Sequence, residues 1–204
     1  MTRLLLATGN LKKLAELQRI LDAALGRERV ELLGLADVPD YPEVPETGLT
    51  FGENALIKAR AGVARTGLPT VADDSGLAVD ALGGMPGVFS ARWSGRHGDD
   101  LANLDLMLAQ ISDLPDEHRG AAFVCAAALV LPGGKEHLVE GRQVGRILRA
   151  PRGDGGFGYD PVFLGERQSR TNAELSPAEK DAISHRGQAF RALAKVIARE
   201  LSAR

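Results

Sequence analysis

The spacing of apolar residues predicts that the chain opens with a strand, a turn and a helix. Residues 4–7 form a continuous apolar run, which is typical of a short buried strand. After a polar turn, leucines return at the three- and four-residue spacing of one helical face, at Leu14, Leu17, Leu21 and Leu25. Residues 30–35 repeat the strand pattern, and we expect the Pro-rich, acidic residues 37–46 to form an ordered loop.

The middle of the chain predicts two helices, two short strands and a β-hairpin. Apolar residues in helical register predict helices at residues 51–65 and 99–111. Short apolar runs predict strands at residues 70–72 and 77–79, on either side of a turn, Asp73-Asp74-Ser75-Gly76. Two longer apolar segments flank Pro132-Gly133-Gly134, which predicts an antiparallel pair at residues 123–131 and 137–147.

The last part of the chain predicts two consecutive helices. Ser176-Pro177-Ala178-Glu179 has an N-cap serine, a proline at the first helical position and a glutamate three residues after the cap. A helix is therefore predicted to begin at Pro177. Apolar residues in helical register predict a final helix at residues 185–201. Because strands and helices alternate early and a hairpin lies in the middle, we expect an α/β protein with a mixed sheet.

Composition narrows the classes of protein and ligand. The 204 residues, 44% hydrophobic and 25% charged, are enough for one large domain or one domain with two lobes. A net charge of −2 gives no general attraction for a nucleic-acid backbone, so we expect a small anionic ligand and no nucleic-acid partner. The single cysteine, Cys125, fits a reducing compartment, and residues 121–131, the longest apolar run, are too short to cross a bilayer. Without a signal-peptide pattern, we expect a cytoplasmic protein that does not bind membranes.

Thr8-Gly9-Asn10 lies where the first predicted strand turns into the first helix, with Lys13 in the first helical turn. Backbone amides at a helix N-terminus attract anions, glycine lets the backbone approach closely, and lysine adds charge for phosphate. These residues are therefore candidates for binding phosphate. On these residues alone, an ordinary turn capped by asparagine remains the alternative.

The adjacent carboxylates of Asp73 and Asp74 repel each other unless a cation or another partner compensates them. Magnesium is a suitable cation because it needs only one or two protein carboxylates and keeps waters and substrate phosphates as its other ligands. Glu46, in the Pro-rich loop, is a candidate for a further ligand. A carboxylate that does not bind metal can polarise water as a general base. The alternative is an acidic turn without a ligand.

The segment Gly153-Asp154-Gly155-Gly156-Phe157-Gly158 has the spacing of the dinucleotide fingerprint, but that motif needs a strand before it and a helix after it. Pro151 precedes the segment, and Pro161 is expected to keep residues 159–163 extended. We therefore exclude a nicotinamide site. A Gly-rich loop that presents Phe157 beside Asp160 is better suited to stacking a flat base and bonding its edge. A loop with a core phenylalanine is the alternative.

Cationic groups gather near the junction of the last two predicted helices, at Lys180, His185 and Arg186. A solvated face is the common explanation for such a cluster. Positive side chains are disfavoured at the start of a helix, however, so an anionic ligand or an acidic partner would explain His185 and Arg186.

Taken together, these segments resemble the inosine triphosphate pyrophosphatase family, the pyrophosphatases of non-standard purine nucleoside triphosphates. The resemblance covers nearly the whole chain, and residues 96–98 and 167–172 match no fixed pattern. The matching pieces, in family order, are LLLATGN with Lys13 and Glu16, ETGLTF-EN-A with Lys58, ADDSGLAVDALGG-PG, FS-ARWSG, GGFGYDPVF, AEL and EK-AISHRG. Each piece is modest alone, but a chance match of so many in one order is rare.

The resemblance implies a role for each candidate residue. The triphosphate would be held by Thr8, Gly9, Asn10, Lys13 and Lys58. Magnesium would be bound by Glu46 and Asp73, with Asp74 as the catalytic carboxylate that activates water and also contacts the metal. The nucleotide would contact Ser75, and its base would be framed by Phe157, Gly158, Tyr159, Asp160, Lys180, His185 and Arg186.

The resemblance also implies the architecture and the reaction. Residues 1–204 would form a single bilobal domain, with two lobes around an elongated mixed β-sheet flanked by helices, the active site in the cleft between the lobes, and usually a homodimer. We expect magnesium-dependent hydrolysis of ITP, dITP and XTP to the monophosphate and pyrophosphate. The alternatives are a non-catalytic purine nucleotide sensor, which would not need both Asp73 and Asp74, and a pyrophosphatase of other nucleoside triphosphates. An aspartyl-phosphate enzyme would need carboxylates two residues apart rather than adjacent.

Overall fold

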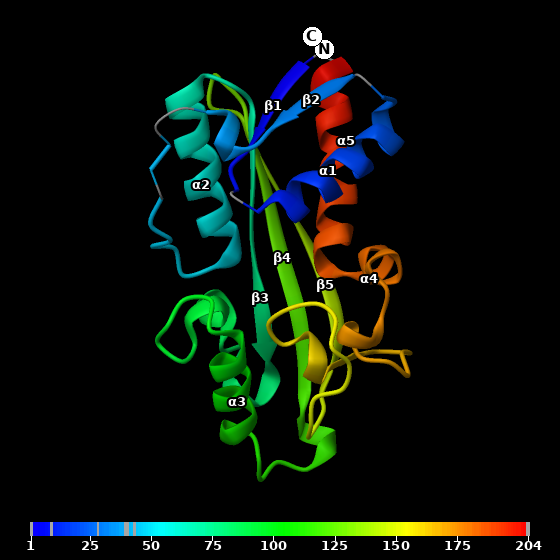
Figure 1. Cartoon of the computed structure of the whole chain (residues 1–204). Coiled ribbons are helices and arrows are strands. Elements are labelled where there is room, and N and C mark those ends of the chain that lie inside the picture. The colour runs from blue at the N-terminus through cyan, green and yellow to red at the C-terminus, as the bar shows by residue number, and fades with distance from the viewer. Residues whose placement is uncertain (1, 9, 28, 39–40, 43, 203–204) are drawn as a thin grey trace. The chain divides into compact units, whose positions relative to one another are not determined.

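The computed structural model describes residues 2–8, 10–27, 29–38, 41–42 and 44–202 (Figure 1). The strands are β1 (Thr2–Leu6), β2 (Val30–Leu33), β3 (Thr70–Val79), β4 (Gly120–Val130), β5 (Glu136–Ile147) and β6 (Phe163–Gly165). The helices are α1 (Leu11–Leu25), α2 (Phe51–Thr66), α3 (Asp100–Gln110), α4 (Pro177–Ile183) and α5 (His185–Ser202). In the part of the chain that the structure describes, no helix is both long and apolar enough to span a membrane.

The strands form one mixed sheet in the order β2-β1-β3-β4-β5-β6. Strand β1 pairs in parallel with β2 and with β3, whereas β6 pairs antiparallel with β5. Strands β4 and β5 form the predicted hairpin, whose turn is closed by the bond from Leu131 N–H to the Lys135 carbonyl at 2.9 Å. The α/β class and the mixed sheet predicted from the sequence are thus confirmed.

The chain divides into two compact units, and three long strands contribute residues to both. Unit 1 comprises Met1–Asp74, Cys125–Gly141 and Arg186–Arg204. Helices α1 and α5 lie on one face of its strands and α2 on the other (Figure 1). The residues of β3 alternate accordingly, because Val71 packs with the core on the α1 and α5 face and Ala72 with the core on the α2 face.

Unit 2 comprises Ser75–Val124 and Arg142–His185. Its core joins residues of β3, β4, β5 and α3 to the segment that precedes β6, including Leu77, Met107, Phe123 and Tyr159. Arg119 is buried at the start of β4, where its guanidinium donates to three backbone carbonyls, those of Ile111, Ile147 and Leu148. Carbonyl oxygens thus satisfy the donors of this buried arginine.

Most predicted boundaries agree with the structure within two residues. The capping box that was predicted before α4 is present, with Glu179 N–H donating to Ser176 Oγ at 3.3 Å and Ser176 N–H donating to Glu179 Oε2 at 2.9 Å. The predicted turn at residues 73–76 is wrong, because β3 runs continuously through it. The predicted extended segment at 159–163 instead contains a 3-10 turn at Asp160–Val162, where the Asp160 carboxylate accepts from Phe157 N–H at 2.9 Å.

Candidate active site

The loop after β1 lies beside the first turn of α1. Asn10 N–H donates to Thr8 Oγ1 at 3.2 Å, and the Asn10 carbonyl accepts from Leu14 N–H at 3.2 Å, which starts the helix. Lys13 projects from the first turn of α1. Gly9, which was predicted to bind phosphate, lies outside the described residues. Thr8, Asn10 and Lys13, three of the residues that were predicted to bind an anion, therefore lie at or just before the start of α1.

Asp73 faces α1 and α5, where two cations meet its carboxylate. Lys13 Nζ lies 2.7 Å from Asp73 Oδ2, and Arg186 Nε lies 3.6 Å from the same oxygen. Burial alone would raise the pKa of Asp73, but Lys13 and Arg186 outweigh it and lower the pKa to about 2. Arg186 also lies 4.0 Å from Glu16 Oε2. The four side chains form an ion network in the interior of unit 1.

Asp74 points to the opposite face of β3, toward α2. This helix begins at a capping box in which Thr50 Oγ1 accepts from Glu53 N–H at 3.2 Å. Asn54 and Lys58 follow four residues apart, so both side chains lie on the same side of the helix. Asn54 Nδ2 donates to Asp74 Oδ2 at 3.0 Å, and Lys58 Nζ lies 3.5 Å from Asp74 Oδ1.

Glu46 joins this group through Lys58, whose Nζ lies 2.9 Å from Glu46 Oε1. Burial opposes the charge of Lys58, but the carboxylates of Asp74 and Glu46 outweigh it and raise the pKa of Lys58 above its ordinary value. Burial raises the pKa of Asp74, and the neighbouring Glu46 and Asp73 add to the effect while Lys58 and Asn54 oppose it. The ammonium therefore stays charged at neutral pH, and the Asp74 carboxyl has the raised pKa that suits a general base.

The described residues contain no group of three or more His, Cys, Asp or Glu side chains placed to hold a metal ion. A magnesium ion that arrives with nucleotide phosphates needs fewer protein ligands, because phosphate and water oxygens complete its shell. Glu46 and Asp74 present hard carboxylate oxygens to one shared cation, the Lys58 ammonium. Both carboxylates therefore have the oxygen ligands and the proximity to a single cation that a magnesium ion would require.

The structure does not bring Asp73 to the same place as Glu46 and Asp74. Consecutive residues of a strand point to opposite faces, and the contacts of Asp73 are with Lys13, Arg186 and the Cys125 thiol. Asp73 Oδ1 is buried and has no hydrogen-bond partner among the described residues. The predicted role of Asp73 as a metal ligand stays a prediction, and these contacts favour a role with the two cations.

A second group of predicted site residues belongs to the Gly-rich loop of unit 2. The Phe157 side chain is 53% exposed, which suits a surface for stacking. Lys180 Nζ forms an ion pair with Asp160 and lies 4.6 Å from the centroid of the Phe157 ring. Gly158 N–H donates to Asp100 Oδ2 at 2.8 Å. The loop, α3 and α4 thus hold an exposed aromatic ring beside a cation.

Other residues that were predicted to frame a base point into the core. Tyr159 is 4% exposed, and its hydroxyl donates to the Ser90 carbonyl at 2.9 Å. The His185 ring is buried and stacks on Phe123, with 4.9 Å between centroids and 12° between planes. Arg186 belongs to the ion network of unit 1, and Ser75 is the partly buried residue of β3 that follows Asp74. The predicted contacts of these side chains with nucleotide stay predictions.

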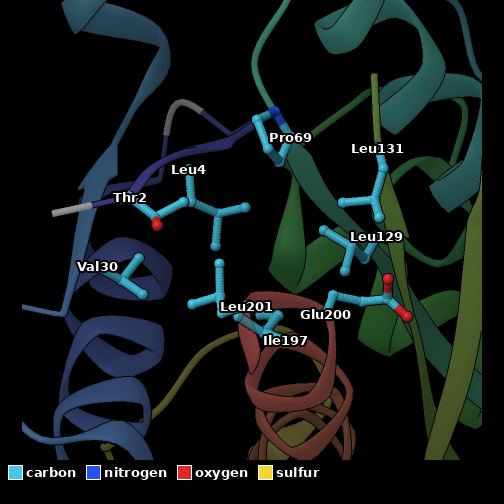
Figure 2. A pocket seen from close by; sticks show the side chains of 9 residues that line it. All are labelled: Thr2, Leu4, Val30, Pro69, Leu129, Leu131, Ile197, Glu200 and Leu201. Atoms are coloured by element: carbon cyan, nitrogen blue, oxygen red, sulfur yellow. The ribbon is translucent and has the colours of Figure 1, made fainter. Parts of the chain in front are cut away.

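A pocket in unit 1 is lined by residues of β1, including Thr2 and Leu4, and by none of the predicted site residues that the structure describes (Figure 2). The described residues that line it are Thr2, Leu4, Val30, Pro69, Leu129, Leu131, Ile197, Glu200 and Leu201. This lining is mostly apolar, and Glu200 is its one charged member. Without a lysine or arginine, the lining does not offer the positive charge that a polyphosphate requires.

Asn54 and Asp100 were missed as candidates by sequence reasoning. Asn54 is completely buried and bonds both Asp74 and Gly48 N–H, at 3.0 and 2.8 Å. Asn54 lies four residues before Lys58 in a predicted helix, and this spacing could have indicated that the two side chains lie on the same side and share a site. No signal in the sequence marks Asp100, because its bond to Gly158 N–H joins residues 58 positions apart.

The fold and these two groups define an α/β protein with carboxylates, lysines and an exposed aromatic ring suited to an anionic ligand that carries a flat group. The chain belongs to the Ham1 family, whose model matches residues 4–196. It is 63% identical over 202 residues to the dITP/XTP pyrophosphatase of Corynebacterium efficiens, covering 96% of this chain and 97% of that protein. It is 61% identical over 202 residues to the dITP/XTP pyrophosphatase of Streptomyces coelicolor, covering 98% and 99%.

Solved structures agree with this assignment. The crystal structure of a nucleoside-triphosphatase, dITP/XTP pyrophosphatase, from Mycobacterium abscessus matches with a TM-score of 0.81 at 64% identity, covering 94% of this chain and 98% of that one. A HAM1 protein from Coxiella burnetii matches with a TM-score of 0.89 at 42% identity, covering 97% and 98%.

Proposed function

We propose that this chain hydrolyses non-standard purine nucleoside triphosphates, namely ITP, dITP and XTP, to the monophosphate and pyrophosphate. The observation that carries the proposal is the Asp74 carboxylate, which Asn54 fixes and which shares a cation with Glu46. Relatives that are more than 60% identical over nearly the full length are named dITP/XTP pyrophosphatases, which supports this substrate class.

The charged residues of unit 1 bind the phosphates. The loop after β1, with Thr8, Gly9 and Asn10, contributes backbone amides and polar side chains. Two lysines that pair with carboxylates in the nucleotide-free protein, Lys13 and Lys58, contribute charge. A phosphate attracts an ammonium more strongly than a single carboxylate does because it offers several charged oxygens. Arg186, 3.6 Å from Asp73, adds charge to this group.

Asp74 activates the water that attacks the triphosphate. The carboxylate accepts the proton, and the Asn54 amide bonds Oδ2 and so fixes the direction of the carboxylate. The lysines offset the charge that builds on the departing pyrophosphate. Magnesium, held by Glu46 and Asp74 together with the substrate, would supply further neutralisation of phosphate charge.

The residues of unit 2 bind the base. Phe157 stacks on the purine, and Lys180, which is paired with Asp160, faces the base edge. Gly158, Tyr159 and His185 hold this group in place through the backbone and the core, and Ser75 contacts the nucleotide. Hypoxanthine and xanthine have an oxygen at position 6, whereas adenine has an amino group. Donors that bond this oxygen would be left unpaired by adenine, and such mispairing gives discrimination of about 10⁴.

We also propose that the protein acts as a homodimer in the cytoplasm and binds no nucleic acid. The resemblance supports the homodimer, and the single cysteine, which fits a reducing compartment, supports the cytoplasm. The net charge of −2 argues against nucleic-acid binding.

A panel of nucleotides tests the proposed function. Purified protein is given ITP, dITP, XTP, GTP or ATP, and released pyrophosphate is measured with magnesium and after addition of a chelator. We expect rapid release from the first three, slow release from GTP and ATP, and none with the chelator. Binding of ITP without release of pyrophosphate would support the nucleotide sensor instead. Equal release from all five would support a general pyrophosphatase.

A further inference from the structure

The Lys58 ammonium occupies the oxygens that the proposed function assigns to a divalent cation. It lies 2.9 Å from Glu46 Oε1 and 3.5 Å from Asp74 Oδ1. Magnesium binds carboxylate oxygens at about 2.0–2.1 Å, and an ammonium binds them at about 2.7–2.9 Å. Because both cations use the same lone pairs and repel each other, these oxygens cannot hold both in these positions.

The surroundings explain why a cation is needed here. Two carboxylates and one ammonium give this group a formal charge of −1, and without Lys58 the charge would be −2. The Asp74 side chain is only 12% exposed and the Glu46 side chain 27%, so water screens the repulsion between the two carboxylates only in part. Asn54 compensates one oxygen of Asp74 but carries no charge.

We propose that Lys58 is a built-in placeholder cation, which neutralises Glu46 and Asp74 in the nucleotide-free protein and leaves them for the polyphosphate when nucleotide and magnesium arrive together. This inference rests on the proposed function. It adds a property that the function does not require: the free protein binds divalent cations weakly because its own ammonium competes for the ligands. The carboxylates would then become available to a metal only when a phosphate is present to take the lysine.

Lys13 provides a matched comparison within unit 1. It is also a lysine on a buried carboxylate, with its Nζ 2.7 Å from Asp73 Oδ2 and its side chain 18% exposed. Arg186 lies beside the same oxygen, so removing Lys13 leaves a second cation on Asp73. Its loss should therefore not create a divalent site.

The test is a titration of the nucleotide-free protein with Mn²⁺, followed by electron paramagnetic resonance of the unbound ion. Lys58→Met keeps most of the side-chain volume and removes the charge, so we expect it to bind Mn²⁺ about tenfold more tightly than wild type or better. Lys13→Met should stay within about threefold of wild type. The double variant Lys58→Met with Glu46→Gln should lose the gain. An unchanged or weaker affinity in Lys58→Met would overturn the proposal, as would an equal gain in Lys13→Met.

If Lys58→Met does not fold, Lys58→Gln replaces it, because glutamine is neutral and keeps an N–H donor for Glu46. The same gain in affinity is expected, and its absence would overturn the proposal. Since the titration contains no nucleotide, it can be read whatever the substrate is. If wild type releases no pyrophosphate from nucleotides, the proposed function is refuted. If Lys58→Met and Lys58→Gln do not bind Mn²⁺ more tightly than wild type, the proposal that Lys58 is a placeholder cation is refuted.

Discussion

Asp73 and Asp74 are consecutive residues of β3, yet their carboxylates bind partners on opposite faces of the strand. Asp73 Oδ2 accepts from Lys13 of α1 at 2.7 Å, and Asp74 Oδ2 accepts from Asn54 of α2 at 3.0 Å. Under the proposed function, Asp73 holds cations on one face while Asp74 accepts a proton on the other. The opposite placement also makes the two residues separable by mutation.

Removing the charge of Asp74 should stop the reaction without preventing binding. In Asp74→Asn the water loses its proton acceptor, so we expect turnover of ITP to fall by about 10²–10⁴-fold. Binding of ITP, measured by calorimetry, should remain because the lysines are intact. A variant that kept the wild-type rate would show that another group activates the water.

Asn54→Ala should shift the pH dependence of the reaction. Asn54 donates to the ionised form of Asp74, so its loss should raise the pKa of a carboxyl that burial already raises. A general base is active when ionised, and kcat/KM is therefore lost as pH falls through this pKa. We expect the acid limb of kcat/KM to move to higher pH than in wild type.

Wild type and Asn54→Ala are measured with the same substrate, so any protonation of the nucleotide affects both pH profiles equally and does not contribute to the difference between them. Coincident acid limbs in wild type and Asn54→Ala would show that the limb does not report Asp74.

Asp73→Asn should act mainly on stability. Removing the Asp73 charge from the buried ion network leaves Lys13 and Arg186 with Glu16 as the remaining carboxylate of that network, so we expect the free energy of unfolding at pH 7 to fall by about 3 kcal/mol. The pKa of Asp73 is lowered to about 2, so its contribution is present above the ordinary value of about 4 and is lost as pH falls from there to about 2. Urea unfolding at pH 7 and pH 3 should show the difference from wild type narrowing at the lower pH. A constant difference would contradict this account.

The sequence predicted the helices well because their apolar residues recur on one face. The final helix was predicted at residues 185–201 and observed at His185–Ser202. The two faces of β3 could not be predicted in this way. The reason is that Thr70–Val79 is largely buried on both faces, so no alternation of polar and apolar residues shows which side chain points to which face. The turn was predicted because Asp73-Asp74-Ser75-Gly76 interrupts two short apolar runs, but β3 continues through these residues and places the two carboxylates on opposite faces.

The sequence indicated which residue types carry the chemistry of the candidate site, but it did not indicate which of these side chains contact one another. Acidic and basic residue types were recognised from their motifs. The contact of Arg186 with Asp73 joins residues 113 positions apart, and only the packing of α5 against the strands of unit 1 determines it. For the same reason, a cluster of cations near residue 185 did not reveal that His185 stacks on Phe123.

Phe157→Ala should weaken substrate binding. The exposed ring is proposed to stack on the purine, and loss of one base-stacking contact costs about 1–3 kcal/mol, or about fivefold to 150-fold in KM. Turnover at saturation should change little because the reacting groups belong to unit 1. Phe157→Tyr keeps the ring and should leave KM within about threefold of wild type. Steady-state kinetics with ITP measures both, and an unchanged KM in Phe157→Ala would exclude stacking.

The Gly-rich loop of residues 153–158, here named the base loop, contains two glycines whose substitution separates the effect of backbone strain from that of a side-chain collision. Gly156 and Gly158 both have positive φ, at 76° and 58°, so alanine should cost about 1 kcal/mol at either position. A Cβ at Gly156 would also collide with the Asp160 carboxylate, whereas nothing lies within 4 Å of one at Gly158. Asp160 accepts from Phe157 N–H and pairs with Lys180. We therefore expect the KM for ITP to be much higher in Gly156→Ala than in Gly158→Ala. The two variants should differ less in their free energy of unfolding than in KM. Equal KM values would show that the position of Asp160 does not control the base loop.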